Sequence, residues 1–539
     1  MFNVYVVGVL LMFVIYIVVG NYAGKRVKGI DDYYVSGRNA PTLLIVGTLI
    51  ASGLSTVGFM GEIGFIYDGY GWPYIIGIAL LNNLGFVFGS IFFGRYIRRS
   101  GALTIPSFFG DRFHSKRIRV LCGVVTVIGI SGYLASVSQG TALLLQELMG
   151  IGYGTALLIT WVTYVSFTIY AGSRGVLLTD TIMFIVFSAM ALISVPYVFK
   201  ATGGWPDAIQ AVVNNPKFSG YYLWTGNTTD AGYMGTVFDL WFYCIIMGVI
   251  WMLVTSISPW QAGRYLMAKN EHIVIRSGVI APVPMLWVAI LIYMSMVCVN
   301  NIDIGLELSS NVYIRLALTC FPVVLGVLVC GGILSAGLSS CTTFLSLIGF
   351  SLYNDIYVPL FGKKGEEREM SLIGSRIVML IVGGFALVFV YFQTPAVMWI
   401  GYFASTVFGT SWGIVGFMSI WSKKINEKGA FWGMICGLGV FLLLQILSKL
   451  GVIAFFGLFR PELLGLIASV IGIFIGNALG TRSEAEIESY EKLHVAPPEI
   501  YADKAAIRRT LMYPKFFIIG GVLLAVMLLI LFALPIANA

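Results

Sequence analysis

The sequence predicts an all-α polytopic membrane protein with about 14 transmembrane helices. Of its 539 residues, 58% are hydrophobic and 11% are charged, whereas a soluble protein of ordinary composition carries about 25% charged residues. Apolar runs of roughly 20 residues recur along the chain, and each can cross a hydrocarbon layer about 30 Å thick. These runs do not alternate apolar with polar residues, which excludes the strands of a membrane barrel.

The predicted spans are spread over the whole chain. We place them at 4–20, 42–68, 72–94, 120–148, 154–170, 175–198, 236–257, 277–299, 318–350, 371–393, 396–421, 430–448, 461–480 and 516–534. The first run lacks the basic start and the small-residue cleavage site of a signal peptide. We therefore expect it to remain as a span.

The distribution of lysine and arginine predicts the orientation. If the N-terminus lies outside, the predicted inner loops hold most of the 33 lysines and arginines. The exceptions are Lys200, Lys217, Arg315, Lys449 and Arg460. The positive-inside rule then predicts that both termini are external. Because the net charge of +8 follows this topology, it does not indicate a nucleic-acid partner.

The order of the spans predicts two repeats of opposite orientation. Five spans within 42–198 begin inside, and the next five, within 236–421, begin outside. Inverted repeats of five helices are typical of transporters that bind their cargo near the middle of the membrane. The rest of the chain divides into an N-terminal helix with an inner loop (1–41), an external loop (199–235) and C-terminal accessory helices (422–539). We expect the charged stretch 481–515 to be a solvated connector.

The first helix of the first repeat contains a stretch that is poor in helix-forming residues. It reads "IASGLSTVG" and covers residues 50–58. If this stretch is unwound, its free backbone carbonyl groups cannot face lipid, so they must line a cavity or bind a cation. Close packing of helices through small residues is the alternative interpretation.

Hydroxyl groups gather on a later apolar span, "ILSAGLSSCTTFLSLIGF" at 333–350. Ser339, Thr342, Thr343 and Ser346 follow the i, i+3, i+4, i+7 spacing of one helix face. A single hydroxyl usually bonds a carbonyl of its own helix, but a stripe of them predicts a polar lining. Neutral oxygens of this kind suit a monovalent cation, because a divalent ion requires several carboxylates.

Asp180, in "YAGSRGVLLTDTIMF", is predicted to lie just inside the membrane on its inner side. A buried acid at this depth is costly and therefore indicates a functional site. The sequence shows no evident lysine or arginine partner for this carboxylate within the membrane. The alternative is a structural Asp at the membrane interface, capped by Thr179, Thr181 or Arg174.

Several motifs together resemble the sodium/solute symporter family, which includes sodium–sugar, sodium–proline, sodium–pantothenate and sialic acid symporters. They are "IASGLSTVGFMGEIG", "ALTIPSFFGDRF", "GSRGVLLTDTI", "RYLMAKNE" and "SAGLSSCTTFLSLIGFSLYNDIY". Their order and spacing hold over about residues 5–480. The resemblance implies a LeuT-like fold with an inverted five-helix repeat.

The resemblance also implies where Na+ binds. A first site falls between the broken first helix and the eighth helix of the repeats, with these ligands: the carbonyl groups of Ala51, Leu54 and Ala336 and the hydroxyl groups of Ser339 and Ser340. Some family members hold a second ion with an acid on the fifth helix. The matching residues here are Asp180, Ser339, Thr342 and Thr343.

The substrate pocket matches the family less clearly. The implied positions are Ser52, Gly58, Phe59, Asn82 or Asn83, Gln139, Trp251 and Thr255. Gly58 stands where some sugar transporters carry glutamine, which argues against a sugar. Glu62 departs from the apolar gate residue of relatives. Three roles are open for it: an outer gate, a contact for a cationic substrate, or a vestibule residue with no special role.

These observations predict a sodium-coupled symporter that imports a small polar organic solute, such as an amino acid, a carboxylate or a vitamin-like compound, by alternating access. Its expected partners are the solute, sodium ions and the lipid bilayer, with no nucleic acid and no obligate protein partner. Its expected place is the plasma membrane. The rival interpretations are an ion channel and a sensor built on the same fold. An enzyme would need catalytic groups within the membrane, which the sequence does not show.

Overall fold

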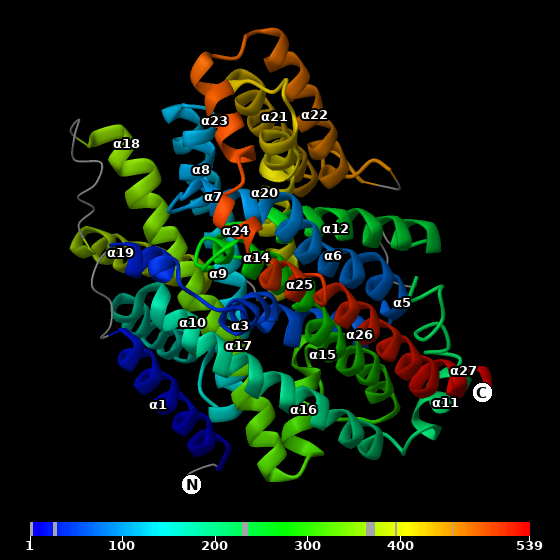
Figure 1. Ribbon diagram of the computed structural model, residues 1–539. Helices are drawn as coiled ribbons and strands as arrows, with labels where there is room; N and C mark the ends of the chain where they lie inside the picture. The colour runs from blue at the N-terminus through cyan, green and yellow to red at the C-terminus, as the bar shows by residue number, and fades with distance from the viewer. Residues whose placement is uncertain (1–3, 25–29, 229–234, 363–371, 394–395, 456–457) are drawn as a thin grey trace.

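The structure is a computed structural model that describes the chain except for residues 1–3, 25–29, 229–234, 363–371, 394–395 and 456–457 (Figure 1). The described residues form helices and one isolated β-bridge, between Ala40 and Ala268. The helices are α1 (Val4–Gly24), α2 (Ile30–Val35), η1 (Ser36–Arg38), α3 (Thr42–Gly53), η2 (Val57–Glu62), α4 (Ile63–Tyr67), α5 (Gly71–Tyr74), η3 (Ile75–Leu80), α6 (Leu81–Phe88), η4 (Gly89–Gly94), α7 (Arg95–Ser100), α8 (Ile105–Arg112), α9 (Lys116–Met149), α10 (Tyr153–Ala201), α11 (Asp207–Asn214), α12 (Val237–Ile257), α13 (Ala262–Tyr265), α14 (Glu271–Ile280), α15 (Pro282–Met296), η5 (Val297–Asn301), η6 (Ser309–Asn311), α16 (Val312–Thr319), α17 (Val323–Phe350), η7 (Ser351–Tyr357), α18 (Val358–Phe361), α19 (Leu372–Phe392), α20 (Val397–Trp421), α21 (Glu427–Lys449), α22 (Pro461–Ala478), α23 (Glu484–His494), α24 (Pro498–Ala502), α25 (Lys504–Thr510), α26 (Tyr513–Leu528), η8 (Leu529–Ala533) and α27 (Leu534–Ala537).

Ten helical segments of the described chain are long and apolar enough to cross a membrane, and a bent pair of helices brings the number to 11. This confirms the all-α polytopic class but not the count of 14. One reason for the difference is α10, which is helical from Tyr153 to Ala201 and continues through the loop predicted between two spans. The division into repeats at 42–198 and 236–421 stays a prediction.

The bent pair is the helix that the sequence predicts to be broken. α3 ends at Gly53, η2 begins at Val57, and the two parts meet at an angle of 50°. Leu54 has extended backbone angles (φ −90°, ψ 94°), so the helical hydrogen bonds stop there. The Ser55 hydroxyl accepts from the N–H of Val57 at 3.1 Å and helps the second part to begin.

The spans that contain α9, α15, α17 and α20 are the most deeply buried ones, and α3 and α10 pack against α17 (Figure 1). α17 is an example of this interior packing, because its hydroxyl-bearing residues and its glycines are almost all buried. Small residues let membrane helices approach closely, and buried hydroxyls then find partners on the neighbouring helix. The interior of the bundle is therefore where polar groups from distant segments meet.

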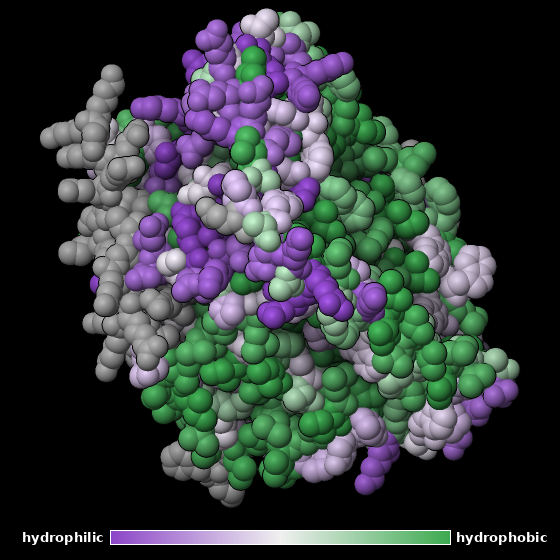
Figure 2. All heavy atoms as spheres, viewed as in Figure 1, coloured by the Kyte–Doolittle hydropathy of each residue, from purple (hydrophilic) through white to green (hydrophobic). Residues whose placement is uncertain are grey.

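Hydrophilic side chains cover α8, α23 and α25 in the upper and central part of the view (Figure 2). Beneath this surface Arg99 pairs with Glu271 at 2.7 Å, and Arg98 donates to the carbonyl oxygen of Ala268 at 2.5 Å. Hydrophobic side chains prevail in the lower part of the view, over α10 and α16. The hydrophilic surface belongs to the side that the positive-inside rule predicts to be cytoplasmic, and we keep external termini as a prediction.

The stretch 481–515 is helical and most of its residues are exposed, as expected of a solvated connector, but it is anchored to the bundle at Glu486. It forms α23, α24 and α25, and Glu486 is only 3% exposed. Its carboxylate accepts from the backbone N–H groups of Glu427 (2.7 Å) and Ser483 (2.6 Å). Arg112 of α8 donates to the backbone carbonyls of Ser419 and Glu486, and burial together with the nearby Arg482 lowers the pKa of Arg112 to about 10. The connector is therefore packed against the bundle.

Candidate functional site

A second broken helix faces the first. α12 ends at Ile257 with an extended residue, Ser258, and the chain resumes helical geometry in α13 at Ala262. A methyl group added to Gly53, at the end of α3, would lie 3.3 Å from the amide nitrogen of Gln261. The two breaks therefore meet in the interior. Pro259 is the sequence signal for the second break, because proline disrupts the helix that precedes it.

Asp180 lies beside these breaks and is fully buried. Its Oδ2 accepts from the Thr48 hydroxyl of α3 at 2.5 Å, and its Oδ1 accepts from the Ser339 hydroxyl of α17 at 2.5 Å. The carboxylate thus joins three helices, α3, α10 and α17. Hydrogen bonds to an ionised acceptor are short and about twice as strong as neutral ones. Of the alternative partners, Thr179 and Thr181 donate to backbone carbonyls of α10, and the side chain of Arg174 lies outside the described residues.

Asp180 also has a basic partner, contrary to the sequence-based expectation. Nη2 of Arg264 lies 3.4 Å from Oδ2 of Asp180 and donates to the Thr343 hydroxyl at 2.6 Å. The predicted spans leave Arg264 in an inner loop, but it belongs to the short helix α13 and is 4% exposed. α12 and α13 together form one span, Val237–Tyr265, and Arg264 lies near its end inside the bundle, where a guanidinium requires a counter-charge.

The hydroxyls of α17 are not all engaged alike. Ser346 donates to the carbonyl oxygen of Thr342, and Thr342 donates to the carbonyl oxygen of Ser339, both within α17. Ser335 donates to Gly331 of the same helix and contacts the hydroxyl of Tyr16. The Ser340 hydroxyl is fully buried and has no hydrogen-bond partner among the described residues. It is therefore the hydroxyl on this helix that is available to a ligand.

The predicted ligands of the first sodium site lie on two packed helices. Ala51 and Leu54 end α3 and are buried, while Ala336, Ser339 and Ser340 lie in the middle of α17, which packs against α3. The Ser340 hydroxyl has no partner among the described residues, and the carbonyl groups of Ala51 and Leu54 lie where α3 stops. Neutral oxygen atoms of this kind suit a sodium ion, so the residues present fit one.

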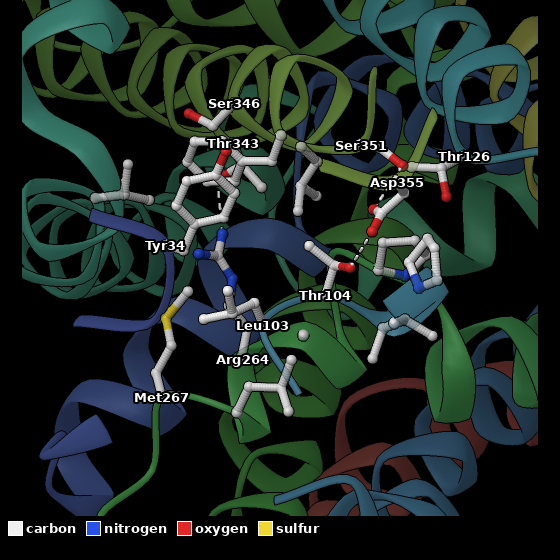
Figure 3. Close-up of a pocket in the computed structure, with 18 residues that line it drawn as sticks. Tyr34, Leu103, Thr104, Thr126, Arg264, Met267, Thr343, Ser346, Ser351 and Asp355 are labelled. Carbon is white, nitrogen blue, oxygen red and sulfur yellow. Dashed lines mark hydrogen bonds between the residues drawn. The ribbon is translucent and has the colours of Figure 1, made fainter. Parts of the chain in front are cut away.

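A cavity of about 40 Å³ lies beside Arg264, on the side predicted to be cytoplasmic (Figure 3). Arg264 and Thr343 line one part, and Asp355 of η7 lines another. Asp355 accepts from the Thr104 hydroxyl at 2.8 Å and from the Ser351 hydroxyl at 3.1 Å. The "ALTIPSFFGDRF" and "SLYNDIY" motifs therefore meet at the wall of this cavity.

The predicted substrate residues occupy two parts of the interior. Asn82 accepts from the Thr255 hydroxyl at 2.5 Å, and Asn83 donates to its own helix while its carbonyl oxygen has no partner among the described residues. These side chains lie between α6 and α12. Ser52 donates to the Thr48 carbonyl at 2.6 Å, so its hydroxyl is already engaged.

The other predicted substrate residues lie around the second half of the broken helix. Gly58 of η2 lies against the hydroxyl of Tyr293, and Phe59 packs edge-on against Phe187. Gln139 accepts from the backbone N–H of Ala396 at 3.1 Å. The Trp251 indole N–H is buried without a described partner.

Glu62 ends η2 and is half-buried. Its Oε2 accepts from the Tyr293 hydroxyl at 2.7 Å. Just beyond it, a cavity of about 310 Å³ is lined by Gly61, Phe65, Asp68, Ser309 and Trp399 among others. Glu62 therefore stands between the interior and this outer cavity, on the side that the topology predicts to be external.

Sequence reasoning missed Thr48, Arg264 and the tyrosines around Glu62. Thr48 carries a weak signal, since it precedes the broken stretch by less than one helical turn. Arg264 carries a better one, because a basic residue soon after Pro259 in an apolar segment is unusual. The tyrosines come from four separate helices, and no sequence spacing predicts that they meet.

Comparison with known proteins adds the family. Residues 33–437 match the model of the Sodium:solute symporter family. The high-affinity proline transporter PutP of Bacillus subtilis is 26% identical over 445 residues, covering 78% of this chain and 88% of that protein. The sodium/pantothenate symporter of Haemophilus influenzae is 25% identical over 470 residues, covering 85% of this chain and 92% of that protein. A solved structure of a Na+-coupled sialic acid symporter, substrate-bound and outward-open, aligns with a TM-score of 0.74 at 19% identity, covering 89% of this chain and 98% of that one.

The fold is that of the LeuT-like class of helical membrane proteins. The chain belongs to the sodium:solute symporter family. Membership confirms the predicted family, the use of Na+ and the expectation of a multi-pass protein of the plasma membrane. The family consists of transporters, which speaks against an enzymatic role.

Proposed function

We propose that this protein imports a small polar organic solute, driven by the inward sodium gradient, through alternating access. The observation that carries this proposal is the Ser340 hydroxyl, which is buried without a partner among the described residues, on the helix that packs against the broken α3. A polar group left unpaired in the interior is costly. A sodium ion that binds there would satisfy it.

The proposed first sodium site consists of the carbonyls of Ala51, Leu54 and Ala336 and the hydroxyls of Ser339 and Ser340. A cation bound between α3 and α17 would hold the two helices together, and its departure would let them separate. Because η2, the second part of the same broken helix, carries Gly58 of the predicted substrate region, the broken helix would link ion binding with solute binding.

The second site is proposed at Asp180 with Ser339, Thr342 and Thr343. Here Arg264 already supplies a positive charge, bonded to both Asp180 and Thr343. We propose that a sodium ion and the Arg264 guanidinium are alternative partners for the Asp180 carboxylate. Arg264 lines the cavity on the predicted cytoplasmic side, so its movement would open a path for the ion.

For the solute we propose the region lined by Gly58, Phe59, Asn83, Gln139 and Trp251, with Ser52, Asn82 and Thr255 as neighbours. Two of these residues present buried polar atoms without a partner among the described residues, the Asn83 carbonyl oxygen and the Trp251 indole N–H. A relative carries proline and another carries pantothenate by name, so these two solutes are the first to assay in proteoliposomes with an imposed sodium gradient.

The Ser340→Ala variant tests the sodium site directly. Loss of one ligand should raise the sodium concentration for half-maximal thermal stabilisation of the purified transporter by about tenfold, given about 1–3 kcal/mol for a buried polar partner. KCl at equal ionic strength measures the effect of salt alone. Ser335→Ala is the matched control, because that hydroxyl is on the same helix and already bonded. Unchanged sodium dependence in Ser340→Ala would place the ion elsewhere.

A further inference from the structure

Glu62 is surrounded by aromatic side chains from four different helices. The Tyr293 hydroxyl donates to its carboxylate at 2.7 Å. The hydroxyls of Tyr74, Tyr133 and Tyr402 lie near enough to interact electrostatically with the same carboxylate. These tyrosines come from α5, α9, α15 and α20, and all four are buried. One acidic group thus stands alone among aromatic rings.

The aromatic cluster continues inward from Glu62. The ring of Trp251 lies 6.2 Å from that of Tyr133 and 5.9 Å from that of Tyr402, measured between centroids. Tyr74 and Tyr293 have centroids 6.2 Å apart. The faces of such rings are negative and attract cations, most strongly where water is excluded. The negative carboxylate and the ring faces therefore favour a ligand of positive charge.

The described residues include no lysine or arginine that pairs with Glu62. A carboxylate at this depth is costly without a counter-charge, and tyrosine hydroxyls offset only part of that cost. Asp180 shows the contrast within the same protein, since it has Arg264 beside it. A positively charged ligand can supply the counter-charge that Glu62 does not receive from the described residues.

One unpaired donor lies in this cluster. The indole N–H of Trp251, 6% exposed, has no hydrogen-bond partner among the described residues. Buried donors of this kind are rare, and each one calls for a partner. A ligand with an acceptor oxygen at one end would supply it.

The outer cavity begins next to Glu62, because the preceding residue, Gly61, lines it. Its lining includes Asp68 and the rings of Phe65, Tyr70 and Trp399, and its described lining includes no lysine or arginine. Asp68 accepts from the Ser309 hydroxyl at 2.8 Å. An acidic group in the entrance and another beneath it raise the local concentration of cations.

We propose that the solute is a small organic cation whose ammonium group, bearing apolar substituents, lies between Glu62 and the rings of Tyr133, Trp251 and Tyr402, with an acceptor oxygen at the Trp251 N–H. This inference rests on the proposed function and names its substrate class. A sodium ion fits the cluster less well, because most of its surface consists of ring carbon and not of oxygen donors.

The test uses the purified full-length transporter and thermal stabilisation in NaCl. Choline is the probe, and 3,3-dimethyl-1-butanol, the neutral compound of the same shape, is its matched control. We expect choline to stabilise the wild type and the neutral compound to require at least about tenfold higher concentration. In Glu62→Gln this preference should fall by about tenfold or more. Glu147→Gln removes a carboxylate paired with Arg315 at the periphery and should leave the preference unchanged.

A second variant protects the test against misfolding of Glu62→Gln. Trp251→Phe keeps a ring but removes the indole N–H. This variant should weaken the binding of choline, whose hydroxyl oxygen can accept a hydrogen bond, by about tenfold. The binding of tetramethylammonium, which has no acceptor, should be unchanged. Equal loss for both compounds would overturn the assigned role of the Trp251 N–H.

The outcomes separate this inference from the proposed function. If sodium stabilises the wild type but neither choline nor tetramethylammonium does, the cation site is refuted while sodium coupling stands. Equal affinity for choline and its neutral analogue, or an unchanged preference in Glu62→Gln, likewise refutes it. If sodium has no effect, the proposed function fails, and the preference for choline can still be measured in KCl.

Discussion

Arg264 and Asp180 lie 84 residues apart in the chain, yet they form the charged centre of the bundle. The pair is supported by hydroxyls from two further helices, Thr48 on α3 and both Ser339 and Thr343 on α17. Removing one partner of a buried ion pair typically costs about 3–5 kcal/mol, because the other charge stays behind uncompensated. A movement of α13 would therefore change the contacts that hold α10 and α17 at this ion pair.

Arg264→Gln should make the protein depend on sodium. Without the guanidinium, Asp180 requires another cation, so we expect a lower unfolding midpoint in KCl and a larger gain on transfer to NaCl than in the wild type. The double variant Asp180→Asn/Arg264→Gln removes both charges and should recover most of the loss in KCl. Arg315→Gln, at a peripheral pair, serves as the control. Equal midpoints in both salts for Arg264→Gln would contradict competition between the ion and the guanidinium.

At the scale of helices, the contact between α3 and α10 determines how close Thr48 comes to Asp180. Gly47 of α3 lies against Thr181 of α10 so closely that an added Cβ would be 2.8 Å from the Cα of Thr181. Backbone cannot shift as easily as the end of a side chain. Only glycine therefore permits this approach, and the hydrogen bond at 2.5 Å between Thr48 and Asp180 depends on it.

Gly47→Ala should push the two helices apart. Overpacking of this kind costs about 1–3 kcal/mol, which exceeds the gain of roughly 1 kcal/mol that alanine brings to a helix. We expect a lower unfolding midpoint and a weaker response to sodium. Gly384→Ala on α19 is the control, since nothing lies within 4 Å of its added methyl group. A Gly47→Ala protein as stable as Gly384→Ala would show that the approach is not needed.

For the whole molecule, the distribution of charge predicts the orientation in the membrane. Most lysines and arginines fall in the predicted inner loops, and the positive-inside rule assigns that side to the cytoplasm. The structure describes all seven cysteines, and Cys320 alone among them is exposed. It follows α16, in a loop between helices on the side predicted to be external. Cys320 can therefore report which compartment this side faces.

Cys320 should react with a membrane-impermeant maleimide added to intact cells. The other cysteines are buried or half-buried, so labelling should be lost in Cys320→Ser. Labelling that requires permeabilised cells would invert the predicted topology. The readout is the labelled fraction before and after permeabilisation, with an exposed cytoplasmic cysteine of another protein as the marker of leakage.

Composition and local sequence pattern by themselves predict the membrane helices, the broken helix and several of the candidate polar residues of this protein. Hydrophobic length predicts membrane helices because a bilayer has a fixed thickness, and the "IASGLSTVG" stretch predicts the break at Leu54 because glycine and β-branched or hydroxyl residues support a helix poorly. The hydroxyl stripe on α17 and the acid at Asp180 likewise follow from local spacing and from the cost of a charge in lipid. These features depend on neighbours along the chain.

Only the tertiary structure decided which of these groups meet. It brought Arg264 to Asp180, left the Ser340 hydroxyl without a partner among the described residues and gathered four tyrosines around Glu62. It also joined the connector at Glu486 to the bundle. The physical reason is that a partner for a buried charge or hydroxyl is chosen by distance in space. That distance is set by helix packing, and sequence separation carries almost no information about it.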